Sequence, residues 1–176
     1  MGNFSLSEQQ RLMHKNLFDK IKNALSKGFY LESIFLEYSA IEGRLEVLAG
    51  VLNLPCNKLL DATMRRKIKI STRIECLKKS YHTAGDIFCN TYLDNVFWKD
   101  IKKWIDNRNM YMHGLLKDAT LYNNRLKEVC ELAETGYNLV NLIYKETTRM
   151  RNKQHKMNYE YVSNCCKGKC DFLKIE

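Results

Sequence analysis

The sequence predicts an all-α fold, an up-and-down bundle of four to five long helices. Apolar residues recur at three- and four-residue steps through several long segments, and no segment shows the alternation of a strand. The 176 residues include one proline and eight glycines, so few positions interrupt a helix. With 45% apolar residues the chain can bury one core. We expect a single helical domain over 1–150 and a polar, basic tail over 151–176, partly disordered.

The first predicted helix covers 7–26. Its apolar seam follows a four-residue step and consists of Leu17, Ile21 and Leu25. Gly28 follows directly, and glycine is the residue that most often ends a helix, because it adopts positive φ without strain. A second helix is therefore expected to begin close to Tyr30.

The second predicted helix covers 30–52 and has the strongest core pattern in the chain. Its apolar positions are Leu31, Ile34, Phe35, Tyr38, Ile41, Leu45, Leu48 and Leu52. The acidic residues of its other face are Glu32, Glu37, Glu42 and Glu46. Pro55 lies just beyond its end, where a helix cannot continue. We expect a core helix with an acidic outer face.

The third region, 56–82, is strongly basic, with eight Lys or Arg residues against Asp61 and Glu75. It predicts two shorter helices with a break near 69–71. Together with the net charge of +9, this region favours an anionic partner, and an ordinary solvated face is the alternative.

The fourth predicted helix, 92–116, carries the most informative residue. Its apolar stripe consists of Leu93, Phe97, Ile101, Trp104, Tyr111 and Leu115. Arg108 falls in the middle of that stripe, where a guanidinium is costly unless it is paired or lines a cleft. Asn109 follows it, and His113 lies about 140° further round the helix. The helix thus offers a permanent cation and a group that titrates near neutral pH.

A fifth helix is predicted over 122–151. The apolar pattern then fades into the tail, which contains Cys165, Cys166 and Cys170. With His155 nearby, these thiols raise the possibility of zinc, but their spacing matches no standard zinc site and free thiols are the simpler interpretation. No signal peptide or membrane span is evident, so we expect a cytoplasmic protein with reduced cysteines.

The arrangement Arg108-Asn109-x-x-x-His113, late in a helical bundle, resembles the HEPN superfamily. The signature of that family is Arg, four to six residues, then His, often with a polar residue after the Arg. The order of the elements is also similar: a long acidic second helix, then the motif helix, then a closing helix. The resemblance covers about 30–144, although its diagnostic part is only three residues.

The resemblance implies a metal-independent endoribonuclease that works as a homodimer without a cofactor. The 2′-hydroxyl of RNA attacks the neighbouring phosphate and leaves a 2′,3′-cyclic phosphate. Arg108 is expected to hold the phosphate, His113 to move the proton and Asn109 to orient the His113 ring. The residues expected to follow an RNA backbone are Arg65, Arg66, Lys67 and Lys69. A role in prokaryotic defence and a regulatory or antitoxin-like partner follow by analogy.

Other interpretations remain open. Glu42 or Glu46 is expected to brace Arg108, and a buried Arg–Glu brace with no catalysis explains the same residues. A non-catalytic bundle of this fold that binds RNA or protein is the main alternative, and a scaffold with a coincidental Arg–His pair is a third. A second match, Arg149 and His155, lies where helical periodicity ends. No phosphate loop, nucleophile elbow or His-Glu-x-x-His motif appears.

Overall fold

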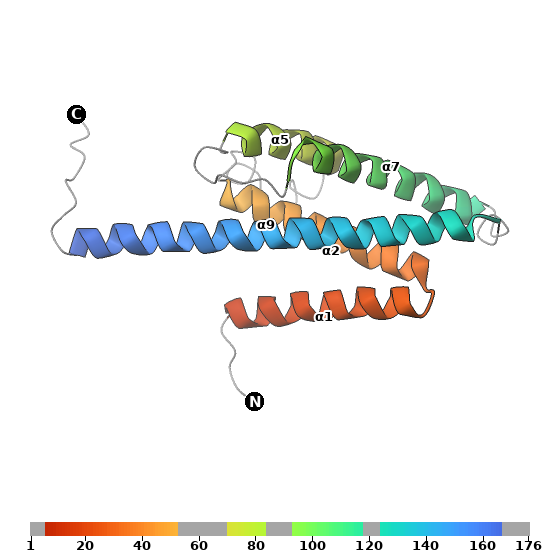
Figure 1. Cartoon of the computed structure of the whole chain (residues 1–176), viewed down its shortest axis with the longest axis horizontal. Coiled ribbons are helices and arrows are strands. Elements are labelled where there is room, and N and C mark those ends of the chain that lie inside the picture. The colour runs from red at the N-terminus through yellow and green to blue at the C-terminus, as the bar shows by residue number, and fades with distance from the viewer. Residues whose placement is uncertain (1–5, 53–69, 84–92, 118–123, 167–176) are drawn as a thin grey trace.

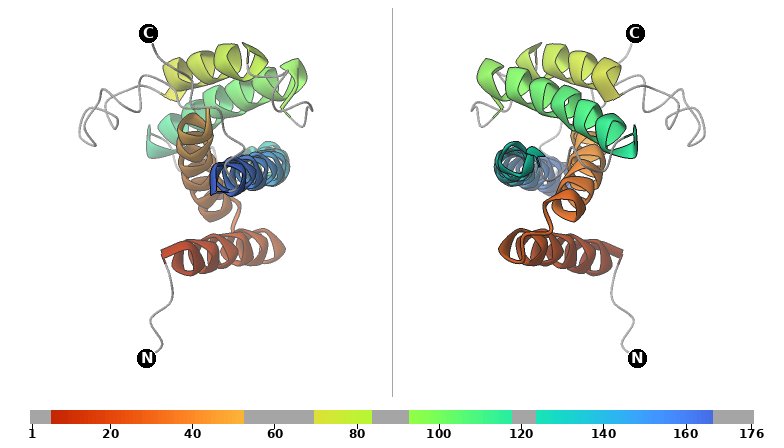
Figure 2. Two further views of the ribbon diagram at one scale, coloured as in Figure 1. Left: turned by 90° about the vertical axis from the view of Figure 1, so that its left-hand side faces the viewer. Right: turned by 90° about the vertical axis from the view of Figure 1, so that its right-hand side faces the viewer.

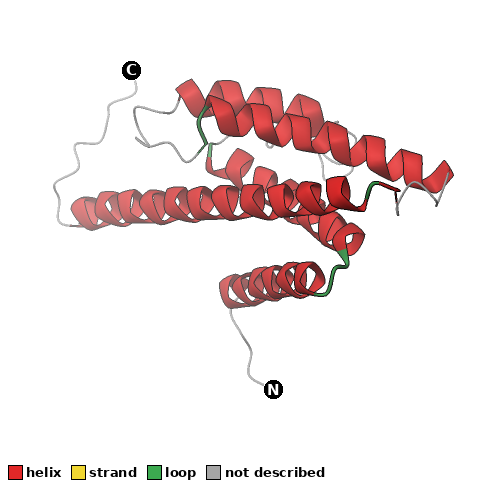
Figure 3. Ribbon diagram, turned by 45° about the vertical axis from the view of Figure 1, so that its right-hand side comes forward, coloured by secondary structure: helices red, strands yellow, loops and turns green. Residues whose placement is uncertain are grey.

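The structure is a computed structural model, and it describes residues 6–52, 70–83, 93–117 and 124–166. These ranges contain five α-helices and no strand (Figure 3). The helices are α1 (Leu6–Ser26), α2 (Tyr30–Val51), α5 (Ile70–Thr83), α7 (Asn95–Lys117) and α9 (Leu126–Cys166). The prediction of an all-α helical bundle is confirmed.

Helices α2 and α9 form the centre of the bundle. Helix α1 lies on one side of this pair, and α5 and α7 lie side by side on the other (Figures 1 and 2). The most extensive contacts are between α2 and α9, followed by α1 with α2 and α7 with α9. Other helices cover α2 from several sides. It therefore exposes less surface to solvent than we expected from its glutamates.

The apolar stripe of α7 supplies much of the core. Phe97, Ile101 and Trp104 are buried, as is Trp98 beside them; Leu93 is also buried but lies just before α7, which begins three residues later than predicted. The Trp104 indole donates to the carbonyl oxygen of Leu132 on α9 at 2.8 Å. Its ring therefore serves packing between α7 and α9, as the helical spacing predicts.

The joint between α1 and α2 forms as the sequence predicts. Gly28 has a φ of +75°, the conformation for which glycine is suited. Its N–H donates to the carbonyl oxygen of Leu25, and the N–H of Phe29 donates to that of Ala24. These two bonds form a Schellman motif, which satisfies carbonyls at the end of α1 and turns the chain into α2.

The predicted end of the fifth helix is wrong. We expected it near 151, but α9 continues as one 41-residue helix through Cys166. Its C-terminal part extends beyond the other described helices (Figure 1). The stretch 151–166 contains neither proline nor glycine, so the helix can propagate without the apolar face that packs earlier residues. The fading apolar pattern therefore does not mark the end of the helix.

Helix α5 corresponds to the second of the two short helices predicted in the basic region. The candidate RNA-contacting residues Arg65, Arg66, Lys67 and Lys69 lie outside the described residues.

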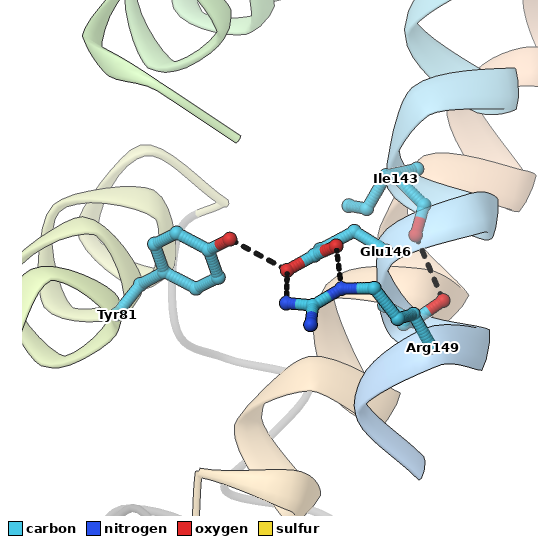
Figure 4. Close-up of polar contacts among 5 residues, drawn as sticks. Tyr81, Ile143, Glu146 and Arg149 are labelled. Carbon is cyan, nitrogen blue, oxygen red and sulfur yellow. Dashed lines mark hydrogen bonds and ion pairs between the residues drawn. The ribbon is translucent and has the colours of Figure 1, made fainter. Parts of the chain in front are cut away.

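A polar network joins α5 to α9 deep in the bundle (Figure 4). The fully buried Glu146 is bound by two nitrogens of Arg149, at 2.8 and 2.6 Å, and by the hydroxyl of Tyr81 at 2.6 Å. Burial and then the bond to Glu146 raise the pKa of Tyr81, so its hydroxyl remains a donor. Arg149, the arginine of the second Arg–His match, is thus part of a structural brace.

Candidate functional site

Arg108 extends from α7 across the N-terminal half of α2. Its guanidinium carbon lies 4.3 Å from the ring centroid of Tyr38 and 5.4 Å from that of Phe35. Both distances are within the range of a cation–π interaction. The side chain is half-buried. Stacking on the two aromatic rings stabilises its guanidinium within the apolar stripe.

The hydrogen-bonding edge of Arg108 remains largely unused. Its Nη1 donates to Oδ1 of the adjacent Asn109 at 3.0 Å. Its Nε is buried and has no hydrogen-bond partner, and within the described ranges no carboxylate pairs with the guanidinium. Stacking occupies the face of a guanidinium, and because Nε is buried, only the Nη groups are left for a ligand. Arg108 is therefore a positioned cation whose charge is not neutralised by a described residue.

Glu42 and Glu46 do not form the expected brace with Arg108. Both pair with Arg73 of α5, at 4.0 and 3.5 Å. The reason is the order of residues along α2: Phe35 and Tyr38 face Arg108, while the two carboxylates lie further along the helix, opposite α5. The single charge of Arg73 offsets one of these two negative charges.

Tyr38 connects these charges. Burial, the largest cause, and then Glu42 raise its pKa, while Arg108 and Arg73 act in the opposite direction. The phenol therefore stays neutral at physiological pH. Its role beside Arg108 is that of a stacking surface.

His113 is exposed on α7, five residues beyond Arg108. In the part of the chain that the structure describes, no hydrogen bond or ion pair joins it to Arg108 or Asn109. The bond of Asn109 goes to Arg108, so the expectation that its amide orients the His113 ring is not met. Asn109 instead holds the guanidinium. One chain presents the cation and the imidazole on different sides of one helix.

Phe35 departs from its predicted place in the core. Its side chain is 49% exposed. Positions 35, 39, 42 and 46 share one helical face, and the other three are Ser39, Glu42 and Glu46. These polar residues indicated an exposed position for Phe35, but the apolar spacing of α2 favoured the core. An aromatic ring thus stands open to solvent beside a cation with free donors.

Glu37 was predicted on the acidic outer face but is fully buried. It lies where α2 packs on α9, because α2 is central and covered on several sides. The hydroxyl of Ser33 donates to Oε1 at 2.7 Å, while Oε2 has no hydrogen-bond partner. Burial raises the pKa of Glu37 to about 8, so the carboxyl is mainly protonated at neutral pH.

Arg44 is a second buried ionisable residue on the same seam, with 4% of its surface exposed. Its guanidinium carbon lies 4.1 Å from the ring centroid of Tyr144 on α9. Burial lowers the pKa of Arg44 to about 10, which leaves it cationic at neutral pH. Neither Glu37 nor Arg44 was predicted as a core residue, since the sequence does not reveal which face of α2 meets α9.

Gly136 allows this close packing. A Cβ at Gly136 would lie 2.2 Å from Oε2 of Glu37 and 2.7 Å from the Trp104 ring. We expect Gly136→Ala to destabilise the protein by about 1–3 kcal/mol, because the clash exceeds the gain of about 1 kcal/mol in helix propensity. Urea unfolding measures the difference. Gly43→Ala is the matched control, because its Cβ meets nothing within 4 Å, and it should stabilise the protein slightly. Equal effects of the two changes would contradict the packing.

A cleft of about 400 Å³ lies between α7 and α9, next to Trp104 and Tyr111. Its charged lining is Asp100, Lys103, Glu128 and Glu131. The Tyr111 hydroxyl donates to Glu128, which also pairs with Arg125 at 3.9 Å. The acidic lining does not suit a phosphate, so Arg108 is the better anion site.

Among the described residues, no cluster of three histidine, cysteine or acidic side chains is arranged to hold a metal ion. Cys76 and Cys130 are free thiols. The side chains of His155, Cys165 and Cys166, and the whole of Cys170, lie outside the described part. None of the described helices has the length and apolar character that a membrane span requires.

Comparison with models of protein families, with curated proteins and with solved structures finds no match. The chemistry of the site is therefore inferred from its own residues.

Proposed function

We propose that the protein is a metal-independent endoribonuclease of the HEPN type. The observation that carries the proposal is the state of Arg108: half-buried, held on two aromatic rings and Asn109, and without a carboxylate partner among the described residues. An RNA phosphate would supply the missing negative charge. Its oxygens match the planar donor edge of a guanidinium.

Arg108 and His113 are suited to different parts of the same reaction. The 2′-oxygen attacks phosphorus, the P–O5′ bond breaks, and the products are a 2′,3′-cyclic phosphate and a 5′-hydroxyl. Arg108 stabilises the charge that develops on the phosphoryl oxygens. One His113 accepts the 2′-hydroxyl proton, and a second donates a proton to the departing 5′-oxygen.

The two histidines come from two copies of the chain in this proposal. A single α7 places His113 about 140° and ~7.5 Å along the axis from Arg108, so one chain does not surround a phosphate with both groups. A twofold dimer supplies each group twice. By family analogy, the enzyme acts in the cytoplasm, in prokaryotic defence, under the control of a regulatory or antitoxin-like protein.

A non-catalytic RNA- or protein-binding module is the second candidate. The exposure of His113 and the absence of any described contact between it and Arg108 favour this alternative. A binding module retains affinity for RNA but makes no cyclic phosphate.

The test is incubation of single-stranded RNA with the purified protein in EDTA, followed by analysis of the product ends. The proposal expects cleavage with 2′,3′-cyclic phosphate ends, and no cleavage at a position that carries a 2′-deoxyribose. RNA that is bound but never cut supports the binding module instead. Cleavage that requires a divalent metal contradicts the proposed mechanism.

A further inference from the structure

We propose that Phe35 is a stacking platform for an unpaired nucleobase next to the phosphate held by Arg108. This inference rests on the proposed function and names one recognition residue of the same site. It comes from the position of an open aromatic ring beside an unpaired cation.

The geometry suits a nucleotide. The Phe35 ring is 49% exposed, and its centroid lies 5.4 Å from the guanidinium carbon of Arg108. In a nucleotide only one ribose separates the base from its phosphate. A phosphate on the free edge of Arg108 therefore brings a base within reach of Phe35. Tyr38 is less suited to this role, because it is only partly exposed and lies closer beneath the guanidinium, at 4.3 Å.

The surroundings of Phe35 favour a nucleobase over a protein surface. On α2 the residues one turn from the ring are the exposed Glu32 and Ser39 and the partly buried Leu31 and Tyr38, so no second exposed apolar side chain of this helix adjoins it. A protein interface of ordinary size needs a broader apolar centre. Glu42 and Glu46 lie about two and three turns further along α2 than Phe35, and Arg73 offsets one of their two charges.

Stacking requires a free base face. In an A-form duplex the bases are stacked on each other, and side chains reach mainly the ribose and phosphate groups. Single strands expose base faces, and stacking on an aromatic side chain is largely independent of base identity. The site therefore predicts preference for unpaired RNA with little sequence specificity at this position.

The experiment measures the affinity of the full chain for an uncleavable 2′-O-methyl RNA oligonucleotide, together with KM and kcat on normal RNA. Phe35→Ala is expected to weaken binding by roughly 5- to 150-fold, the equivalent of one lost stacking contact, and to raise KM more than it lowers kcat. Phe35→Trp should preserve binding. Phe29→Ala is the matched control, because Phe29 is 55% exposed but has no cation–π contact with Arg108, and its binding should be unchanged.

A second arm uses oligonucleotides with one abasic nucleotide at successive positions. At one position the loss of the base should weaken wild-type binding, while Phe35→Ala should be insensitive to it. Sedimentation should show the same oligomeric state for Phe35→Ala and the wild type.

Two results would overturn the inference. Phe35→Ala that binds single strands as tightly as the wild type excludes stacking, and Phe35→Ala that loses its dimer places the ring in a subunit interface. In either case cleavage by the wild type leaves the proposed function intact. A wild-type protein that neither binds nor cuts RNA removes both proposals together.

Discussion

His113→Ala is expected to lower the rate of RNA cleavage by roughly 100- to 10,000-fold, the usual contribution of a general acid or base. The loss should appear in kcat, with little change in KM, because His113 is exposed and acts on protons and not on binding. Single-turnover cleavage in EDTA measures the effect. Unfolding in urea should be almost unchanged, since His113 has no hydrogen bond or ion pair among the described residues.

Three further variants help to assign the effect. Met110→Ala removes an exposed side chain from the same helix and should leave the rate unchanged. Arg108→Lys keeps the charge but loses the planar donor edge, so it should also cut slowly. Its matched control is Arg125→Lys, which changes an arginine of an exposed ion pair. Cleavage at the wild-type rate by His113→Ala would exclude the assigned proton-transfer role.

Glu37→Gln is expected to remove a large pH dependence from the stability of the protein. The carboxyl is fully buried, and burial raises its pKa from 4.5 to about 8. Between these values the unfolded chain releases a proton that the folded chain retains, so the free energy of unfolding falls as pH rises. Above about pH 8 both states are ionised and the decline ends. The full loss is roughly 4–5 kcal/mol.

Urea titrations from pH 4.5 to 9 test this expectation. The free energy of unfolding of the variant, relative to that of the wild type, should rise steadily up to about pH 8, because glutamine cannot ionise. Glu32→Gln, at an exposed position on the same helix, should differ from the wild type by less than about 0.5 kcal/mol throughout. If the difference in free energy of unfolding between Glu37→Gln and the wild type stays constant with pH, the pKa of Glu37 is not raised in the folded protein.

Most of the helical framework was predictable, because helices follow from local periodicity and from glycine and proline. Gly28 ends α1 as expected, and the predicted stripe of α7 supplies the core residues Leu93, Phe97, Ile101 and Trp104. The end of α9 was not predictable from apolar spacing, since a helix without a breaker can continue past its packed segment.

The candidate site was predictable in its charge but not in its contacts. The apolar surroundings of Arg108 in the sequence indicated an unusual arginine, and the structure shows one held on Tyr38 and Phe35. Spacing along α2 did not distinguish these rings from core residues or Glu37 from the exposed glutamates. That distinction depends on which helices cover α2, a tertiary property that one-dimensional periodicity does not contain.

Mixing the wild type with an inactive variant tests most directly whether histidines from two chains act on one phosphodiester. Equal amounts of wild type and His113→Ala are unfolded together, refolded and assayed on single-stranded RNA in EDTA. Random pairing leaves a quarter of the dimers with two intact His113 side chains, and each mixed dimer lacks one of the two. The mixture should cleave at about a quarter of the rate of the same amount of wild-type protein. A mixture with about half of the wild-type rate, the sum of its two components, would contradict a site shared between subunits.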